Sequence, residues 1–289
     1  MNWKLLTLAT TSLVALGLSA GQVSAAAMGT VSMGVGHTWQ DDDGGEGSQD
    51  IDDNFANIYG SARVNIPYSQ TVNLQVDAFG DAAFANENEG DNYGTGVGLG
   101  AHINYRDGTG LLGIFGSFGR TSSIDENTAS FSAFGFEGQL FCDTWTLLGQ
   151  IGYLDSAEDN DSDNEGKFFN SAGYIQGGVS YYASRNLRLS GVLTYADGEQ
   201  DEDDVVLWEW LLSAEYLFSP SVPAGVFAEY RGVNAENDEN DRETDNHTLR
   251  IGVRIHFGAT DLMTSDRSGA SASLPEFQRW VSEAGEQID

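Results

Sequence analysis

Charged and titratable side chains recur at alternate positions inside segments that are otherwise apolar. One segment carries Glu229 and Arg231, and the last such segment carries Arg250, Arg254 and His256. Successive side chains of a β-strand point to opposite faces, so these residues would share one face and leave the other to Leu, Ile and Val. Charges gathered on one face of a strand line a water-filled passage, where they set its ion selectivity, or pair with one another as interior packing.

Strands are therefore the elements that must hold these side chains. In the last segment, Leu249, Ile251, Val253, Ile255 and Phe257 alternate with Thr248, Arg250, Gly252, Arg254 and His256. The pattern predicts twelve strands, at about 28–40, 55–66, 71–82, 93–106, 111–122, 130–142, 144–155, 169–183, 187–197, 205–218, 224–235 and 247–258. Around 111–120 and 131–141 both faces are apolar, so alternation does not fix the orientation of those two strands.

The connections between these strands are of two kinds. Long acidic loops, such as 41–53 and 236–245, alternate with short turns, such as 67–70 and 184–186, and the loops hold most of the 44 Asp and Glu residues. Long loops at one edge and tight turns at the other are typical of an up-and-down antiparallel β-barrel that crosses a membrane. An even strand number closes such a sheet without an edge, which a lipid environment requires.

Aromatic residues fall near the ends of the apolar faces. Trp39, Tyr153, Tyr195, Trp208, Trp210 and Tyr230 belong to the loop end, and Tyr105, Trp145, Tyr181, Phe218 and Phe257 belong to the turn end. Two belts of amphipathic rings are expected at the two interfaces between membrane and water. A soluble β-sandwich is the alternative reading of the alternation, but it does not account for the charge difference between loops and turns.

The overall composition restricts the partners of the chain. The net charge is −31 over 289 residues, whereas nucleic-acid binding requires a basic surface. We therefore expect no nucleic-acid partner. Cys142 is the only cysteine, so no intramolecular disulfide forms. The expected partners are outer-membrane lipid and lipopolysaccharide, small solutes and an assembly factor, and the oligomeric state is left open.

The first 25 residues have the three parts of a secretory signal peptide. Lys4 supplies the positive charge, residues 5–18 form an apolar region, and Val23-Ser24-Ala25 suits signal peptidase. We expect cleavage and export, with residues 26–258 forming the barrel and residues 259–289 forming a tail on the periplasmic side. No cysteine lies directly after the cleavage site, so we expect no lipid anchor.

The end of the last strand carries a recognisable pattern. Arg250, Gly252, Ile255 and Phe257 occupy a polar position, a glycine two places later and two alternate apolar positions. This segment resembles the C-terminal β-signal of bacterial outer-membrane proteins, and the layout of 26–258 looks like a porin or small channel of Gram-negative bacteria. The resemblance implies recognition by the barrel-assembly machinery. Many such proteins end at the Phe, whereas this chain continues for 32 residues.

The tail contains one helix signal. Ser273 and Glu276 have the spacing of a capping box, and Pro275 suits a first helical turn. Phe277, Trp280 and Val281 would then share one helical face. The helix is expected to dock at the periplasmic mouth or partly plug the lumen, and a frayed tail is the alternative.

The strand pattern also predicts which side chains line the lumen. The charged and titratable candidates are Arg63, Asp77, His102, Glu137, Arg188, Glu209, Glu215, Glu229, Arg231, Arg250, Arg254 and His256, and inward glycines such as Gly100 leave space. Four of the arginines would form a basic ladder on one wall, opposed by glutamates; mutual pairing is the alternative. We expect a passive channel for small hydrophilic solutes or ions, weakly cation-preferring because of the loop carboxylates.

Three other kinds of chemistry would each need particular residues. Residues 159–166 have the D-x-D-x-D spacing of a calcium loop, but Asn164 and Asn170 replace the required Gly and Glu, so no metal site or other cofactor is expected. An outer-membrane phospholipase would need a His-x-Ser pair, which the four histidines lack. A barrel protease, using His37 with Asp41 or His247 with Asp245, and a structural or adhesive barrel are retained as alternatives; the chain is not expected to be an enzyme.

Overall fold

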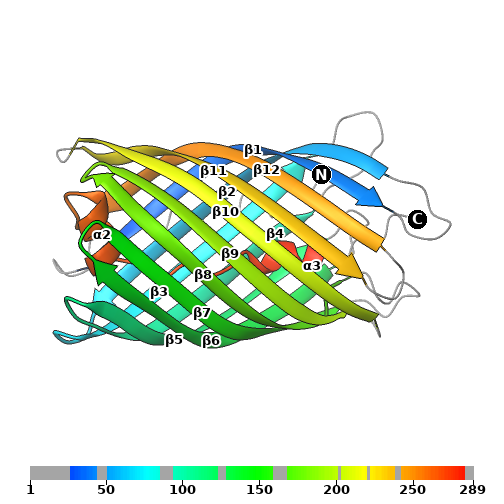
Figure 1. Cartoon of the computed structure of the whole chain (residues 1–289), viewed down its shortest axis with the longest axis horizontal. Coiled ribbons are helices and arrows are strands. Elements are labelled where there is room, and N and C mark those ends of the chain that lie inside the picture. Colours follow the sequence, from blue (N-terminus) through cyan, green and yellow to red (C-terminus); the bar gives the residue numbers. More distant parts are fainter. Residues whose placement is uncertain are drawn as a thin grey trace.

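The computed structural model describes residues 27–43, 51–84, 94–122, 128–158, 168–200, 203–219, 222–237 and 242–283. These residues form a closed barrel of twelve antiparallel strands, each paired with its neighbours in the chain (Figure 1). The strands are β1 Met28–Asp43, β2 Ile51–Pro67, β3 Val72–Phe84, β4 Thr95–Arg106, β5 Gly110–Ser122, β6 Thr128–Cys142, β7 Trp145–Glu158, β8 Ser171–Ser184, β9 Leu187–Gln200, β10 Asp203–Ser219, β11 Val222–Asn237 and β12 Arg242–Phe257. The predicted fold and strand number are confirmed.

Closure joins the first strand to the last. In the β1–β12 pair, Gly29 lies opposite Phe257 and Asp41 lies opposite Asp245. The register therefore runs without a shift from the turn end to the loop end, and opposite residues share a face of the barrel. Several strands continue beyond the predicted limits into the acidic segments; β2 begins at Ile51 and β12 at Arg242. Paired backbones satisfy one another in water as well as in lipid, so polar side chains do not end the ladder.

The outer face is apolar on every side of the barrel. Ile151, Ile251 and Phe136 are more than half exposed, which is the arrangement of a wall that faces lipid. Trp39 and Trp208 are exposed on this face toward the loop end, and Trp145 is exposed toward the turn end, as the two belts require.

The exposure of their side chains shows which face of β5 and of β6 points outward, although both faces of these strands are apolar. Leu112, Ile114 and Phe118 of β5 and Phe134, Phe136 and Leu140 of β6 face outward, whereas Leu111, Phe115 and Phe131 are buried inside. Both faces are apolar here because the inner face packs against another part of the chain.

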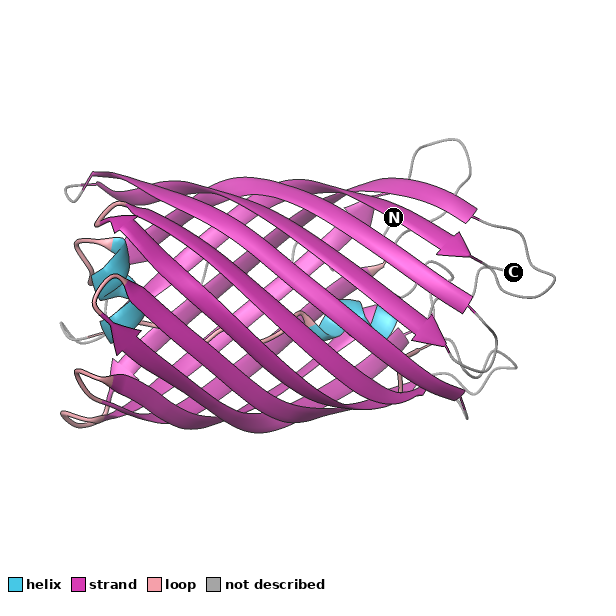
Figure 2. Cartoon of the chain, in the orientation of Figure 1, coloured by secondary structure: helices cyan, strands magenta, loops and turns pink. Residues whose placement is uncertain are grey.

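That part is the described stretch of the C-terminal tail, residues 259–283, which enters the barrel (Figure 2). Helix α2, Leu262–Ser268, lies at the turn end; helix α3, Phe277–Glu283, lies deeper in the lumen, and an extended segment joins them (Figure 1). No helix among the described residues is long and apolar enough to cross a membrane. The sequence did not predict α2, and α3 begins later than the Ser273 signal suggested.

Candidate functional site in the barrel lumen

The predicted lining residues all lie on strands with their side chains on the inner face. Asp77, His102, Glu137, Glu209, Glu215, Arg231, Arg250 and His256 are buried, and Arg63, Arg188, Glu229 and Arg254 are half-buried. Alternation along each strand is sufficient to place them there, because one face of every strand must meet lipid. The lumen is therefore a polar compartment inside an apolar wall.

Two of the four arginines of the predicted basic ladder, Arg231 and Arg254, pair with carboxylates of the wall, as does Arg188 outside the ladder. Arg254 lies 2.7 Å from Glu215 and 3.3 Å from Glu229, and Arg188 lies 2.6 Å from Glu215. Arg231 pairs with Glu209 at 2.7 Å. Mutual pairing, the alternative to opposed charged walls, thus describes these arginines.

Two arginines of the ladder contact the tail instead. Arg250 binds both carboxylate oxygens of Glu276, with Nη2 donating to Oε2 at 2.7 Å. Nearer the turn end, Arg63 donates to the Ser273 hydroxyl at 3.2 Å. The tail therefore completes the charge pairing of the wall at one position and its hydrogen bonding at another.

A separate polar cluster is centred on His102. Its Nδ1 lies 2.8 Å from Glu137 and its Nε2 lies 3.3 Å from Asp77, and Gln75 donates to Asp77 at 2.8 Å. All of these groups are buried on β3, β4 and β6. Such a network fixes the side chains of the wall where the tail passes.

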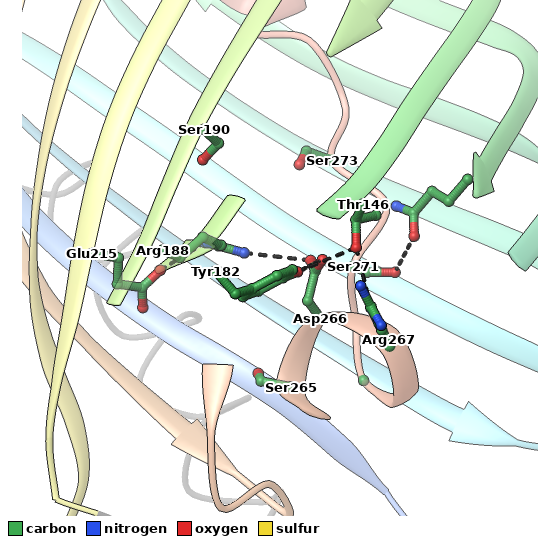
Figure 3. Close-up of polar contacts among 12 residues, drawn as sticks. Thr146, Tyr182, Arg188, Ser190, Glu215, Ser265, Asp266, Arg267, Ser271 and Ser273 are labelled. Atoms are coloured by element: carbon green, nitrogen blue, oxygen red, sulfur yellow. Dashed lines mark hydrogen bonds and ion pairs between the residues drawn. The ribbon is translucent and has the colours of Figure 1, made fainter. Parts of the chain in front are cut away.

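Helix α2 is attached to the turn end of the wall by charged hydrogen bonds (Figure 3). The Tyr182 hydroxyl donates to Asp266, and Arg188 reaches the same carboxylate at 3.3 Å. The Ser265 hydroxyl lies 2.7 Å from Nδ1 of His256. Asp261 accepts from the Thr264 amide at 2.8 Å, which caps the helix.

Wall side chains supply the backbone partners of the extended segment. Arg106 donates to the Gly269 carbonyl at 2.6 Å and to the Ser271 hydroxyl at 3.2 Å. Gln75 donates to the Ala272 carbonyl at 2.6 Å, and Gln150 donates to the Ser273 carbonyl at 2.8 Å. Buried backbone groups must find partners, so these contacts allow an extended chain to pass through the barrel without joining the sheet.

Helix α3 is held differently, by apolar packing. Phe277, Trp280 and Val281 are fully buried. The Tyr174 ring packs against Phe277 and Trp280 with centroids 5.6 Å and 5.5 Å apart. The Trp280 indole also donates to Glu209 at 3.0 Å, so its polar group is satisfied. The shared face of Phe277, Trp280 and Val281 thus fills the lumen toward the loop end.

Glu276 lies between the extended segment, which is held by hydrogen bonds, and α3, which is held by apolar packing. Besides Arg250, its carboxylate lies 3.7 Å from Arg231 and 3.7 Å from Arg279. Glu276 belongs to the tail rather than to a spanning strand. Burial opposes its ionisation, but the arginines, Arg250 first, outweigh burial and hold the pKa of this carboxyl well below its ordinary value.

Space remains beside the tail. A cavity of about 200 Å³ lies between tail and wall, and Ser32, Tyr59, Arg63, Arg254 and Leu274 are among its lining residues. Glycines of the wall accommodate the tail itself: a Cβ at Gly100 would overlap the Leu274 side chain. Inward glycines therefore serve in part to fit the tail rather than to leave an open pore.

Sequence reasoning missed several residues that hold the tail. Gln75, Arg106, Phe131, Gln150 and Tyr174 all contact it or pack against it. Alternation places Gln75 on the inner face, but the role of all five depends on a segment distant in sequence. The signal available was the doubly apolar pattern of β5 and β6, which indicates an apolar partner inside the lumen.

The residues of the protease alternative lie on the outer face of the paired strands β1 and β12, where Asp41 is opposite Asp245 and His247 is opposite Trp39. His247 contacts the Tyr230 hydroxyl at 2.9 Å, and His37 lies beside Trp39. The predicted calcium-like segment, 159–166, lies outside the described residues. Within the described ranges no group of three or more His, Cys, Asp or Glu side chains is arranged so that it could hold a metal ion.

No family model and no curated protein sequence matches the chain. Solved outer-membrane barrels do match in fold. A channel from Pseudomonas putida F1 is 12% identical with a TM-score of 0.52, covering 79% of this chain and 95% of that one. A deletion mutant of the TodX monoaromatic hydrocarbon channel is 8% identical with a TM-score of 0.52, covering 79% and 90%. The translocator domain of the autotransporter NalP from Neisseria meningitidis is 14% identical with a TM-score of 0.49, covering 86% and 98%.

These identities are low, so the likeness shows the fold alone. The chain has the fold of an outer-membrane β-barrel, as the β-signal resemblance implied.

Proposed function

We propose that this protein is an outer-membrane channel for small hydrophilic solutes and that its C-terminal tail closes the channel from within. One observation carries the proposal: the polar lumen is occupied by a segment that belongs to no strand. The barrel is closed by pairing between strands alone, with no tail residue in the order of the sheet. Removal of the tail would therefore leave a closed wall around a polar passage.

The finer parts of the proposal follow from the sequence. The chain is exported by a cleaved signal peptide and inserted by the barrel-assembly machinery, with the turn end toward the periplasm. Transport is passive. Loop carboxylates concentrate cations at the outer mouth, so selectivity in the open state is weakly cationic at low salt.

Planar bilayers test the proposal. The wild-type chain is expected to show rare or brief openings, and deletion of residues 259–289 is expected to give steady conductance steps. Deletion of residues 284–289 is the matched control, because it shortens the chain and keeps every described tail contact. Silence of the 259–289 deletion, once heat-modifiable gel migration shows that it has folded, would contradict the channel. A reversal potential of anionic sign at low and high salt would contradict the cation preference.

A hydrolase is the second candidate, and one arrangement favours it. The Ser265 hydroxyl, His256 and Glu215 form a hydrogen-bonded chain, with His256 Nε2 lying 2.6 Å from Glu215. This order resembles a nucleophile, a base and an orienting acid. However, Ser265 is buried within α2, and Glu215 also binds two arginines.

The arrangement thus serves at least to attach α2, and we prefer the channel. A fluorophosphonate probe distinguishes the two. Labelling of the wild-type chain that disappears in Ser265→Ala would favour the hydrolase; no labelling favours attachment.

A further inference from the structure

Arg250 differs from the other arginines of the lumen in its choice of partner. Glu276 is the only carboxylate within ion-pair distance of Arg250 among the described residues, and it belongs to the tail. Arg254, by contrast, pairs with Glu215 and Glu229, both on the wall. When the tail leaves, Arg254 keeps its partners, whereas Arg250 loses the carboxylate that it binds.

The geometry at Arg250 is that of a carboxylate receptor. Its two terminal nitrogens face the two oxygens of one carboxylate, which is the bidentate arrangement that gives arginine its preference for planar anions. Its guanidinium lies over the Tyr59 ring, 4.8 Å from the centroid. The ring supports the flat face of the cation and leaves its edge for the anion.

The site contains hydrogen-bonding groups that the tail does not satisfy. The Tyr59 hydroxyl and Nε of Arg250 are both buried, and neither has a hydrogen-bond partner among the described residues. Buried polar atoms of native proteins rarely lack a hydrogen-bond partner. Both residues also line the cavity beside the tail, which connects the site with the rest of the lumen.

The charges around the site indicate a monoanion. Arg250 and Arg231 lie on the wall, but Arg231 is already 2.7 Å from Glu209, so about one positive charge is available once Glu276 departs. Farther along the same cavity, Arg63 has no carboxylate within 4 Å in the described part of the chain and offers a second contact for an anion moving through. A dianionic phosphate is less well matched than a carboxylate.

We infer that Arg250, Arg231 and Tyr59 form a binding site for a small carboxylate-bearing solute, and that Glu276 occupies this site when the tail is in the lumen. The inference rests on the proposed function, because it makes the carboxylate a permeant or gating solute of the channel. The tail then acts as an internal competitor: a solute carboxylate at Arg250 and Glu276 at Arg250 exclude each other.

Equilibrium dialysis of radiolabelled propionate, which reproduces the end of a glutamate side chain, tests the site directly. Folded full-length chains in nonionic detergent are compared at constant ionic strength: wild type, Glu276→Ala, Glu276→Ala with Arg250→Gln, and Glu276→Ala with Arg254→Gln. Glu276→Ala is expected to bind one equivalent of propionate at least about tenfold more tightly than wild type, which is the range for charge-assisted hydrogen bonds.

The arginine variants decide which residue is responsible. Arg250→Gln is expected to weaken propionate binding about tenfold or more, and Arg254→Gln, the matched loss of a lumen charge, is expected to change it less than about threefold. If Arg250→Gln does not fold, Arg250→Lys replaces it and should show a partial loss, since lysine keeps the charge without the fork. Equal binding in the Arg250 and Arg254 variants would overturn the site.

Two further outcomes separate the possible failures. Inorganic phosphate that displaces propionate better than acetate does would overturn the assignment to carboxylates. Absence of propionate binding in a Glu276→Ala chain that conducts would refute the carboxylate site and leave the channel intact. Propionate binding in a chain that never conducts, with or without its tail, would support the site and refute the channel.

Discussion

The two ends of the tail are attached to the same wall by different physics. Helix α2 is held by hydrogen bonds to charged groups, such as Asp266 with Tyr182 and Arg188, and by the small apolar contact of Leu262. Helix α3 is held by the buried rings of the main apolar cluster. Water can replace much of a polar contact, but it cannot replace the packing of an indole. The comparison implies that α3 stabilises the closed state most and that α2 and the extended segment set the path by which the tail enters.

The largest expected effect comes from α3. Trp280→Ala removes a fully buried ring and should weaken docking of the tail by about 3–5 kcal/mol. Single-channel recording should show a large rise in open probability. Trp208→Ala, the same substitution on the outer face, is the control and should leave gating unchanged. A closed channel in Trp280→Ala would show that aromatic packing does not hold the tail.

Acidification tests the ion pairs of Glu276, which lies between the extended segment and α3. The pKa of Glu276 is lowered in the docked state, so its contribution is complete above the ordinary carboxyl pKa of about 4.3 and is lost as pH falls through the lowered value. Open probability should be constant between about pH 7 and pH 5 and rise only under stronger acid. Glu276→Gln should lack the component of this rise that Glu276 contributes. An identical acid response in that variant would exclude Glu276 as the responsive group.

A smaller effect is expected at α2. Asp266→Asn weakens the contacts with Tyr182 and Arg188 and should reduce attachment of α2 by about 1.5–3 kcal/mol. Hydrogen exchange followed by mass spectrometry should show faster exchange in residues 259–272 and little change in α3. Faster exchange throughout the tail would mean that the two ends undock together, which would remove the distinction between them.

The smallest effect is expected in the extended segment. Gln150→Ala removes one donor to the Ser273 carbonyl and should cost about 0.5–1.5 kcal/mol. Exchange should increase near Ser273 alone. A loss of docking free energy as large as that of Trp280→Ala would mean that the hydrogen bonds of the extended segment, rather than the rings of α3, hold the tail.

The sequence predicted the wall much better than its contents. Alternation identifies Ile251 as outward and Arg250 as inward because lipid imposes one polarity on every strand. It cannot identify the partner of Arg250, because Glu276 reaches it through tertiary packing of a segment outside the sheet. The helical face of Phe277 and Trp280 was visible in the sequence, but its receptor, Tyr174, was not, since no local pattern relates β8 to the tail.

A reversible tether between tail and wall tests the central claim most directly. A Cβ built on Gly96 would lie 2.8 Å from Cβ of Gln278, so cysteines at these positions can form a disulfide after a small shift. The pair is introduced together with Cys142→Ser and Glu276→Ala, and conductance is recorded before and after reduction. The tail-closed channel predicts silence when oxidised and frequent openings when reduced; equal conductance steps in both states, with the cross-link verified by mass spectrometry, would contradict it.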